Sequence, residues 1–163
     1  MNFKKIFCWP PFLAGVGSAV TIAILGYITY ESILSDTGYG LWLFASFGSS
    51  VVLVFGYPEN TFAQPKNIFF GHLLTSLMGV LFLTFFEVNF LTMGIAVGIS
   101  VMLMMMFKIT HPPAGGNPIA VMLGGVSFQF LIFPVMVGAI AIIIGGIFYN
   151  SLILKRKYPV SWK

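Results

Sequence analysis

The sequence predicts an all-α integral membrane protein, and three observations support this fold class. Of its 163 residues, 58% are apolar and only 7% are charged, whereas a soluble domain has about 45–50% apolar and about 25% charged residues. The mean hydropathy is +0.99, and apolar stretches long enough to cross a bilayer recur along the chain. So few charged side chains cannot cover the surface of a soluble fold, and the same composition excludes a disordered chain.

Five apolar stretches predict full transmembrane helices, because each approaches the ~20 residues needed to span the hydrocarbon core. They occupy residues 12–30, 39–57, 68–86, 90–107 and 130–154. A sixth stretch, residues 119–128, is shorter and follows a segment that holds three prolines and two glycines. We therefore predict one short or broken membrane element after that segment, and a single membrane domain over residues 1–163.

The distribution of charge favours six crossings over five. If Lys4 and Lys5 are cytoplasmic, six crossings place all eight basic residues on that side, as the positive-inside rule expects. Five crossings would put the basic tail, residues 155–157, outside. The alternative is that residues 115–129 form a re-entrant or surface loop and the tail is reversed. The basic residues form no extended face, so nucleic-acid binding is not expected.

The N-terminal segment bears on the choice of membrane. Its first apolar run is too long for the core of a signal peptide and begins too early to leave room for a transit peptide. We therefore expect a bacterial-type plasma (inner) membrane, with both termini in the cytoplasm. The lone Cys8 excludes a disulfide scaffold.

The two halves of the chain resemble each other at an offset of 67 residues. This offset carries Gly48, Gly71 and Gly79 onto Gly115, Gly138 and Gly146, and Ser49-Ser50 onto Gly116-Asn117. We predict a 3+3 inverted repeat with halves 10–87 and 88–154, an arrangement in which transporters place their site at the repeat interface. Glycine makes up 18 of the residues, so chance matches are the alternative.

The strongest candidate site is the run T-H-P-P-A-G-G-N over residues 110–117. Proline has no N–H donor and holds the residue before it in an extended conformation, so one helix should end here. Glycine lets a ligand approach the main chain closely, and a helix that begins near Asn117 would aim free N–H groups at an anion. The predicted substrate-binding residues are His111, Pro112, Pro113, Gly115, Gly116 and Asn117. A sharp interfacial turn is the alternative.

Two further groups of polar residues lie in the first half. Gly48, Ser49 and Ser50 occupy the position that corresponds to the 115–117 segment, and their hydroxyls could face the substrate. Those hydroxyls could equally bond to their own helix, and small residues allow helices to pack closely. His72 lies inside a predicted span, where an ionisable group is by default a functional candidate. A neutral histidine hydrogen-bonded between helices is the alternative for His72.

Other kinds of chemistry lack the residues that they need. Two histidines and one distant cysteine do not supply the three or four ligands of a zinc site. No phosphate-binding loop, dinucleotide fingerprint or pair of carboxylates is present. We therefore expect no metal, no cofactor and no enzyme activity. A membrane-embedded enzyme that relies on the two histidines is the alternative.

Two blocks of sequence resemble the HPP family of integral membrane proteins. One is His111-Pro112-Pro113-Ala114-Gly115-Gly116, and the other runs from Phe47 to Phe55 and continues through Pro58, Ala63-Gln64-Pro65, Asn67 and Gly71-His72. The resemblance covers roughly residues 40–150. The chain departs from the family at Gly116-Asn117-Pro118, where members more often have small residues.

The resemblance implies transport, because members are described as proteins with about four spans, and plant and cyanobacterial members are associated with nitrite. We therefore expect transport of a small inorganic anion, nitrite first, by an assembly of identical chains in a lipid bilayer. The alternatives are a non-transporting membrane subunit that organises a partner complex, and a channel for another small solute.

Overall fold

The computed structural model describes residues 10–34 and 44–162, and all regular structure in these ranges is helical, as predicted. The helices are α2 (Pro10–Leu34), α3 (Phe44–Val51), η1 (Val52–Gly56), η2 (Thr61–Ala63), α4 (Pro65–Phe85), α5 (Phe90–Met106), η3 (Pro112–Gly116), α6 (Asn117–Gly124), η4 (Leu131–Met136), α7 (Val137–Ile147) and η5 (Phe148–Ile153). Here η2 and η3 are 3₁₀ helices, and η1, η4 and η5 are π-helical continuations of their neighbours.

Three of the described helical stretches are long and apolar enough to cross a membrane: Pro10–Tyr30, Pro65–Phe85 and Leu131–Ile153. The other two predicted full spans are shorter apolar helices, Ala45–Gly56 and Phe90–Met106. The prediction of five full-length spans is therefore not confirmed.

Helix α5 is bounded at both ends, since Asn89 and Thr92 form a capping box at its start and Lys108 has a positive φ of 55° after its end. The first residues of the predicted span 39–57 lie outside the described ranges.

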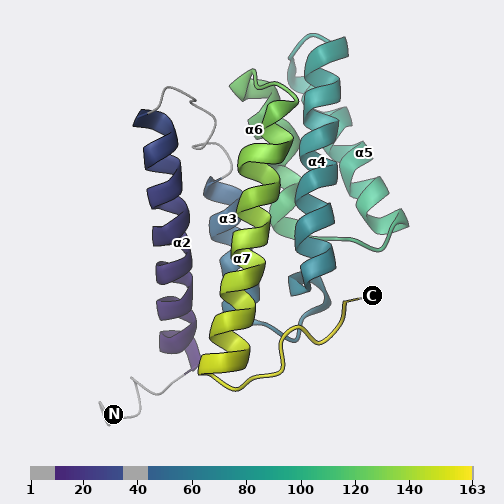
Figure 1. Ribbon diagram of the computed structural model, residues 1–163. Coiled ribbons are helices and arrows are strands. Elements are labelled where there is room, and N and C mark those ends of the chain that lie inside the picture. The colour runs from purple at the N-terminus through teal and green to yellow at the C-terminus, as the bar shows by residue number, and fades with distance from the viewer. Residues whose placement is uncertain (1–9, 35–43, 163) are drawn as a thin grey trace.

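Successive helices alternate in direction (Figure 1). Helices α2, α4 and α6 run one way, and α3, α5 and α7 run the other way, so that α2 begins and η5 ends at the same end of the bundle. Helix α6, with η3 before it, is the short element predicted after the proline segment. Lys4, Lys5 and Asp36, on which the predicted orientation depends, lie outside the described residues.

Helix α4 contacts α5, α6, α7, η3 and η4, whereas α2 packs on α3, η1 and α7 at one edge of the bundle (Figure 1). Glycines permit the closest contacts. A Cβ at Gly79 of α4 would lie 2.8 Å from Val121 Cβ of α6, and a Cβ at Gly146 of α7 would lie 2.4 Å from Val54 Cγ1 of η1. Close approach at small residues is how membrane helices gain packing energy. Lipid tails are as apolar as the side chains, so the hydrophobic effect does not drive helices together in a bilayer.

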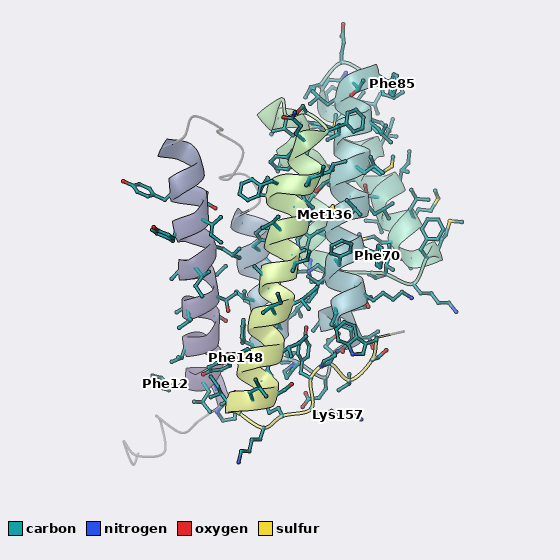
Figure 2. The ribbon with its side chains drawn as sticks, in the orientation of Figure 1. Phe12, Phe70, Phe85, Met136, Phe148 and Lys157 are labelled. Atoms are coloured by element: carbon teal, nitrogen blue, oxygen red, sulfur yellow. The ribbon has the colours of Figure 1, made fainter. Side chains whose placement is uncertain are left out.

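Large apolar side chains project outward along the bundle, as Phe12 does near the lower end of α2 and Phe85 near the upper end of α4 (Figure 2). Phe85 is 72% exposed and Leu152 is 66% exposed. A water-soluble monomer rarely presents so much apolar surface. Acyl chains would solvate these side chains, which agrees with the composition of the chain.

Candidate functional site

A buried polar cluster joins α3, α4 and the segment before η3. Ser50 Oγ lies 2.9 Å from His72 Nε2 and 2.8 Å from His111 Nε2. All three side chains are fully buried. The two imidazoles meet edge to face with their centroids 5.0 Å apart. One serine hydroxyl therefore bridges two histidines that are distant in sequence.

Asn117 extends the cluster from the start of α6. Its Nδ2 lies 3.0 Å from His72 Nδ1 and donates to Ser76 Oγ at 3.1 Å. Ser76 is one turn beyond His72 on α4, so both side chains face α6. Asn117 Oδ1 is buried and has no hydrogen-bond partner among the described residues. An unpaired buried acceptor is costly, so this oxygen has hydrogen-bonding capacity to spare within the cluster.

The break between α5 and η3 places His111. Pro112 follows it, and His111 has an extended backbone with φ −135° and ψ 96°, which is the conformation that a following proline favours. Its Nδ1 lies 2.7 Å from the carbonyl oxygen of Phe62 in η2, just before α4. Asn67 Nδ2 donates to Thr110 O at 2.9 Å and ties the same break to α4.

Ring packing completes the enclosure of the histidines. Phe47 of α3 meets His72 edge to face at 5.1 Å between centroids. Gly71 provides the space for His111, since a Cβ there would lie 2.7 Å from His111 Cβ. His72 is seven residues after Pro65, where α4 begins, so the cluster lies about 10 Å along that helix at 1.5 Å per residue.

Only part of the predicted site gathers in this cluster. His72, His111, Asn117 and Ser50 come together, and all four are buried. Ser49 is exposed, and its hydroxyl donates to Ala45 O of its own helix at 3.2 Å. The remaining predicted residues lie outside the hydrogen-bonded cluster: Gly48, Pro113 and Gly115 are half-buried, and Pro112 and Gly116 are exposed.

Three members of the cluster were not predicted as site residues. Ser76 could have been found from its four-residue spacing from His72, and Gly71 from its place directly before His72. Phe62 contributes only its carbonyl oxygen, and no side-chain pattern reveals which main-chain group a distant histidine meets.

The segment before α4 that contains Phe62, the partner of His111, also anchors the C-terminal tail. Tyr158 donates from its hydroxyl to Ala63 O at 2.8 Å, and burial raises the pKa of Tyr158, which keeps this donor protonated. Gln64 Oε1 accepts hydrogen bonds from Val160 N at 2.9 Å and Ser161 N at 3.3 Å. The tail therefore closes over the end of the bundle nearest to Phe62.

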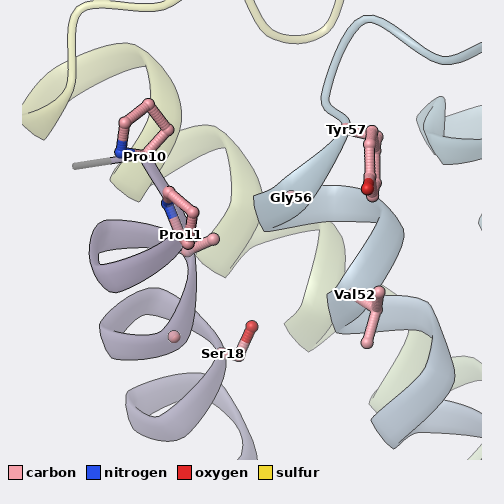
Figure 3. A pocket seen from close by; sticks show the side chains of 8 residues that line it. Pro10, Pro11, Ser18, Val52, Gly56 and Tyr57 are labelled. Atoms are coloured by element: carbon pink, nitrogen blue, oxygen red, sulfur yellow. The ribbon is translucent and has the colours of Figure 1, made fainter.

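Two pockets among the described residues lie away from the hydrogen-bonded cluster. A pocket of about 470 Å³ opens between the start of α2 and the end of η1, where Pro10, Pro11, Ser18, Val52, Gly56 and Tyr57 line it (Figure 3). A second, of about 320 Å³, lies between Phe70 and Trp162. Neither is lined by Ser50, His72, His111 or Asn117, and these four side chains are almost completely buried, so a ligand could contact the histidines only after the surrounding residues moved. The described residues hold no group of three side chains that could bind a metal ion.

Comparison with known proteins places this chain in a family. A family model described as the transmembrane region of HPP proteins matches residues 7–159. Two Dictyostelium discoideum proteins, each named only as a transmembrane protein, are 32% and 28% identical to this chain over 90% of its length. The chain spans about half the length of these curated relatives, 54% and 49% respectively. No solved structure matches.

Proposed function

The chain belongs to the HPP transmembrane family, and on this premise we propose that it transports a small inorganic anion across a membrane, with nitrite as the first substrate to test. The observation that carries the proposal is the cluster of Ser50, His72, His111 and Asn117, which joins α3, α4 and the start of α6. Irregular backbone at membrane depth is tolerated where it is buried in protein or lines a water-filled cavity, and ionisable groups inside a membrane mark substrate or proton pathways. The choice of nitrite rests on the family resemblance.

Symmetry between the halves supports a transport mechanism. Gly79 packs on Val121, and Gly146 packs on Val54. The offset of 67 residues that carries Gly79 onto Gly146 also carries Val54 onto Val121, so the two contacts exchange under the proposed inverted repeat. The same offset relates Ser50 to Asn117, the two residues that hold opposite nitrogens of His72. A site between two such halves can open to either side by rocking of one half against the other.

The closed packing of the cluster fits an occluded state. The four side chains are almost completely buried, and Gly115 and Gly116, next to Asn117, have open space where a Cβ would lie. We propose that movement of η3 and α6 exposes the histidines and the main chain at these glycines to the anion. Gly48 and Pro113 flank this route, and Pro112 stiffens the break.

The setting of the transporter follows from the same premise. We propose a bacterial-type inner-membrane protein with both termini in the cytoplasm. The described helices alternate in direction, and the described basic residues, Lys66, Lys108 and residues 155–157, adjoin helix ends that lie at one end of the bundle. We further propose an assembly of identical chains without enzymatic activity. Such an assembly would cover part of the exposed apolar surface of α5, which includes Met102 and Met105.

The test is nitrite uptake into proteoliposomes, with protein-free vesicles used to subtract the passive leak of nitrous acid. The parent should take up nitrite, and Asn117→Ala and His111→Ala should lose uptake while remaining folded. Ser100→Ala is the matched control, because Ser100 is buried and its hydroxyl bonds Ala96 O within its own helix at 2.7 Å. If the parent moves none of nitrite, nitrate, formate or chloride, transport is refuted. A subunit that organises a partner then becomes the leading interpretation.

A further inference from the structure

The hydrogen-bonding partners determine where the protons of the cluster lie. The carbonyl oxygen of Phe62 can only accept, so His111 Nδ1 carries a proton and, in the neutral ring, His111 Nε2 is an acceptor. Ser50 must then donate its one hydroxyl proton to His111 Nε2. Ser50 Oγ in turn accepts from His72 Nε2, which leaves His72 Nδ1 to accept from the Asn117 amide.

One additional proton fits the same positions of the heavy atoms. If His111 Nε2 is protonated, it donates to Ser50 Oγ, which already accepts from His72 Nε2. The Ser50 hydroxyl can then turn to the carbonyl oxygen of Ser46, 2.9 Å away. The oxygen of Ser50 has two lone pairs and can accept from both imidazoles. Rotation of one hydroxyl is therefore sufficient to accommodate the extra proton.

The charged state of the pair has no counter-ion in the described residues. Among the ionisable side chains next to the cluster in sequence, Glu59 and Lys108 are exposed and Lys66 is half-buried at the start of α4. No carboxylate among the described residues is hydrogen-bonded to either imidazole. A buried charge without a partner is unstable, so an anion that binds nearby would stabilise the protonated histidine pair. By thermodynamic linkage, protonation of the pair would increase the affinity of the protein for the anion to the same extent.

We propose that Ser50, His72 and His111 form a proton-binding relay whose protonated state recruits the anion, so that one proton and one anion cross together. The proton comes from water on the side where the anion enters, binds at His111 Nε2, and returns to water with the anion on the other side. No bond other than those to the proton is made or broken. This inference deepens the proposed function and rests on it for the identity of the anion.

Proton-coupled flux is the first test. Proteoliposomes that contain a pH-sensitive dye are held at zero voltage with valinomycin and potassium, and nitrite uptake and internal acidification are recorded together above the leak of protein-free vesicles. The parent should acidify the lumen by one proton per nitrite. Ser50→Ala should reduce coupled uptake by about tenfold or more, the factor expected for loss of a hydrogen bond to a charged group. Ser100→Ala should match the parent. Nitrite uptake without acidification, or equal rates for Ser50→Ala and Ser100→Ala, would overturn the relay.

Nitrogen-15 NMR of labelled histidine in lipid nanodiscs tests the relay without a substrate. The parent at neutral pH should show His111 protonated at Nδ1 and His72 protonated at Nε2, and one imidazole should gain a second proton on acidification. Added nitrite should move that protonation to higher pH. The opposite tautomers, or two imidazoles that stay neutral until the protein unfolds, would overturn the relay even if nitrite transport is observed. If the parent transports nothing but shows these tautomers and titrates, the proposed function fails and the proton site stands.

Discussion

Gly71→Ala is the substitution whose effect the structure defines most closely. The new Cβ would lie 2.7 Å from His111 Cβ and 3.3 Å from Ile109 O, whereas ordinary contacts begin at 3.4 Å. His111 Cβ would have to move away by about 0.7 Å to reach an ordinary contact distance. Neither His111 Cβ nor Ile109 O is the flexible end of a side chain that could move freely. Overpacking of this kind costs about 1–3 kcal/mol, and the gain of alanine over glycine within a helix offsets up to about 1 kcal/mol of it.

The matched control is Gly98→Ala in the interior of α5, where nothing lies within 4 Å of the added Cβ. Both variants gain the same helix propensity, so their difference isolates the overpacking. We expect Gly71→Ala to be less stable than Gly98→Ala by about 1–3 kcal/mol, measured by circular dichroism as the fraction of sodium dodecyl sulfate in mixed micelles is raised.

The same displacement should disturb the histidines. The hydrogen bonds of His111 to Phe62 O and to Ser50 Oγ are 2.7 and 2.8 Å long, and a shift of about 0.7 Å would lengthen at least one of them beyond the normal range. The histidine NMR signals of Gly71→Ala should therefore change, and those of Gly98→Ala should not. Equal stability of the two variants, together with unchanged histidine signals, would refute the close contact.

Three further outcomes are expected. Asn89→Ala removes the capping box of α5 and should destabilise the protein by about 1 kcal/mol in the same mixed-micelle assay; no change would show that α5 does not need its cap. Gln64→Ala removes the acceptor of Val160 N, so the tail should be cleaved faster by limited proteolysis, and an unchanged rate would refute the anchoring role. Because burial raises the pKa of Tyr158, the folded state resists its ionisation, and stability should be lost as the pH rises above the ordinary value of 10.0. Tyr158→Phe should show a smaller loss in that range, and a parent and variant with equal slopes would contradict this.

Much of the architecture could be predicted because it depends on local chemistry. Hydropathy located α2, α4 and the helix that contains α7, and the prolines after His111 marked the break that ends α5 and starts η3. A proline acts on its own backbone and that of the preceding residue, so its effect can be read without knowledge of the fold. The lengths of α3 and α5 could not be read in this way, since an apolar stretch does not reveal where caps and turns end a helix.

Composition and local backbone preference determined that this chain is helical, belongs in a bilayer and breaks at the His-Pro-Pro segment. Only the tertiary structure decided that His72 and His111 share Ser50, that Asn117 rather than Ser49 completes the cluster, and that Phe62 orients His111. Hydropathy and backbone preference depend on each residue and its near neighbours in the sequence, so they can be read directly from the sequence. The partners of Ser50 are 22 and 61 residues away. Such contacts arise only when the tertiary fold brings distant segments together, as it does where Gly71 leaves room for His111.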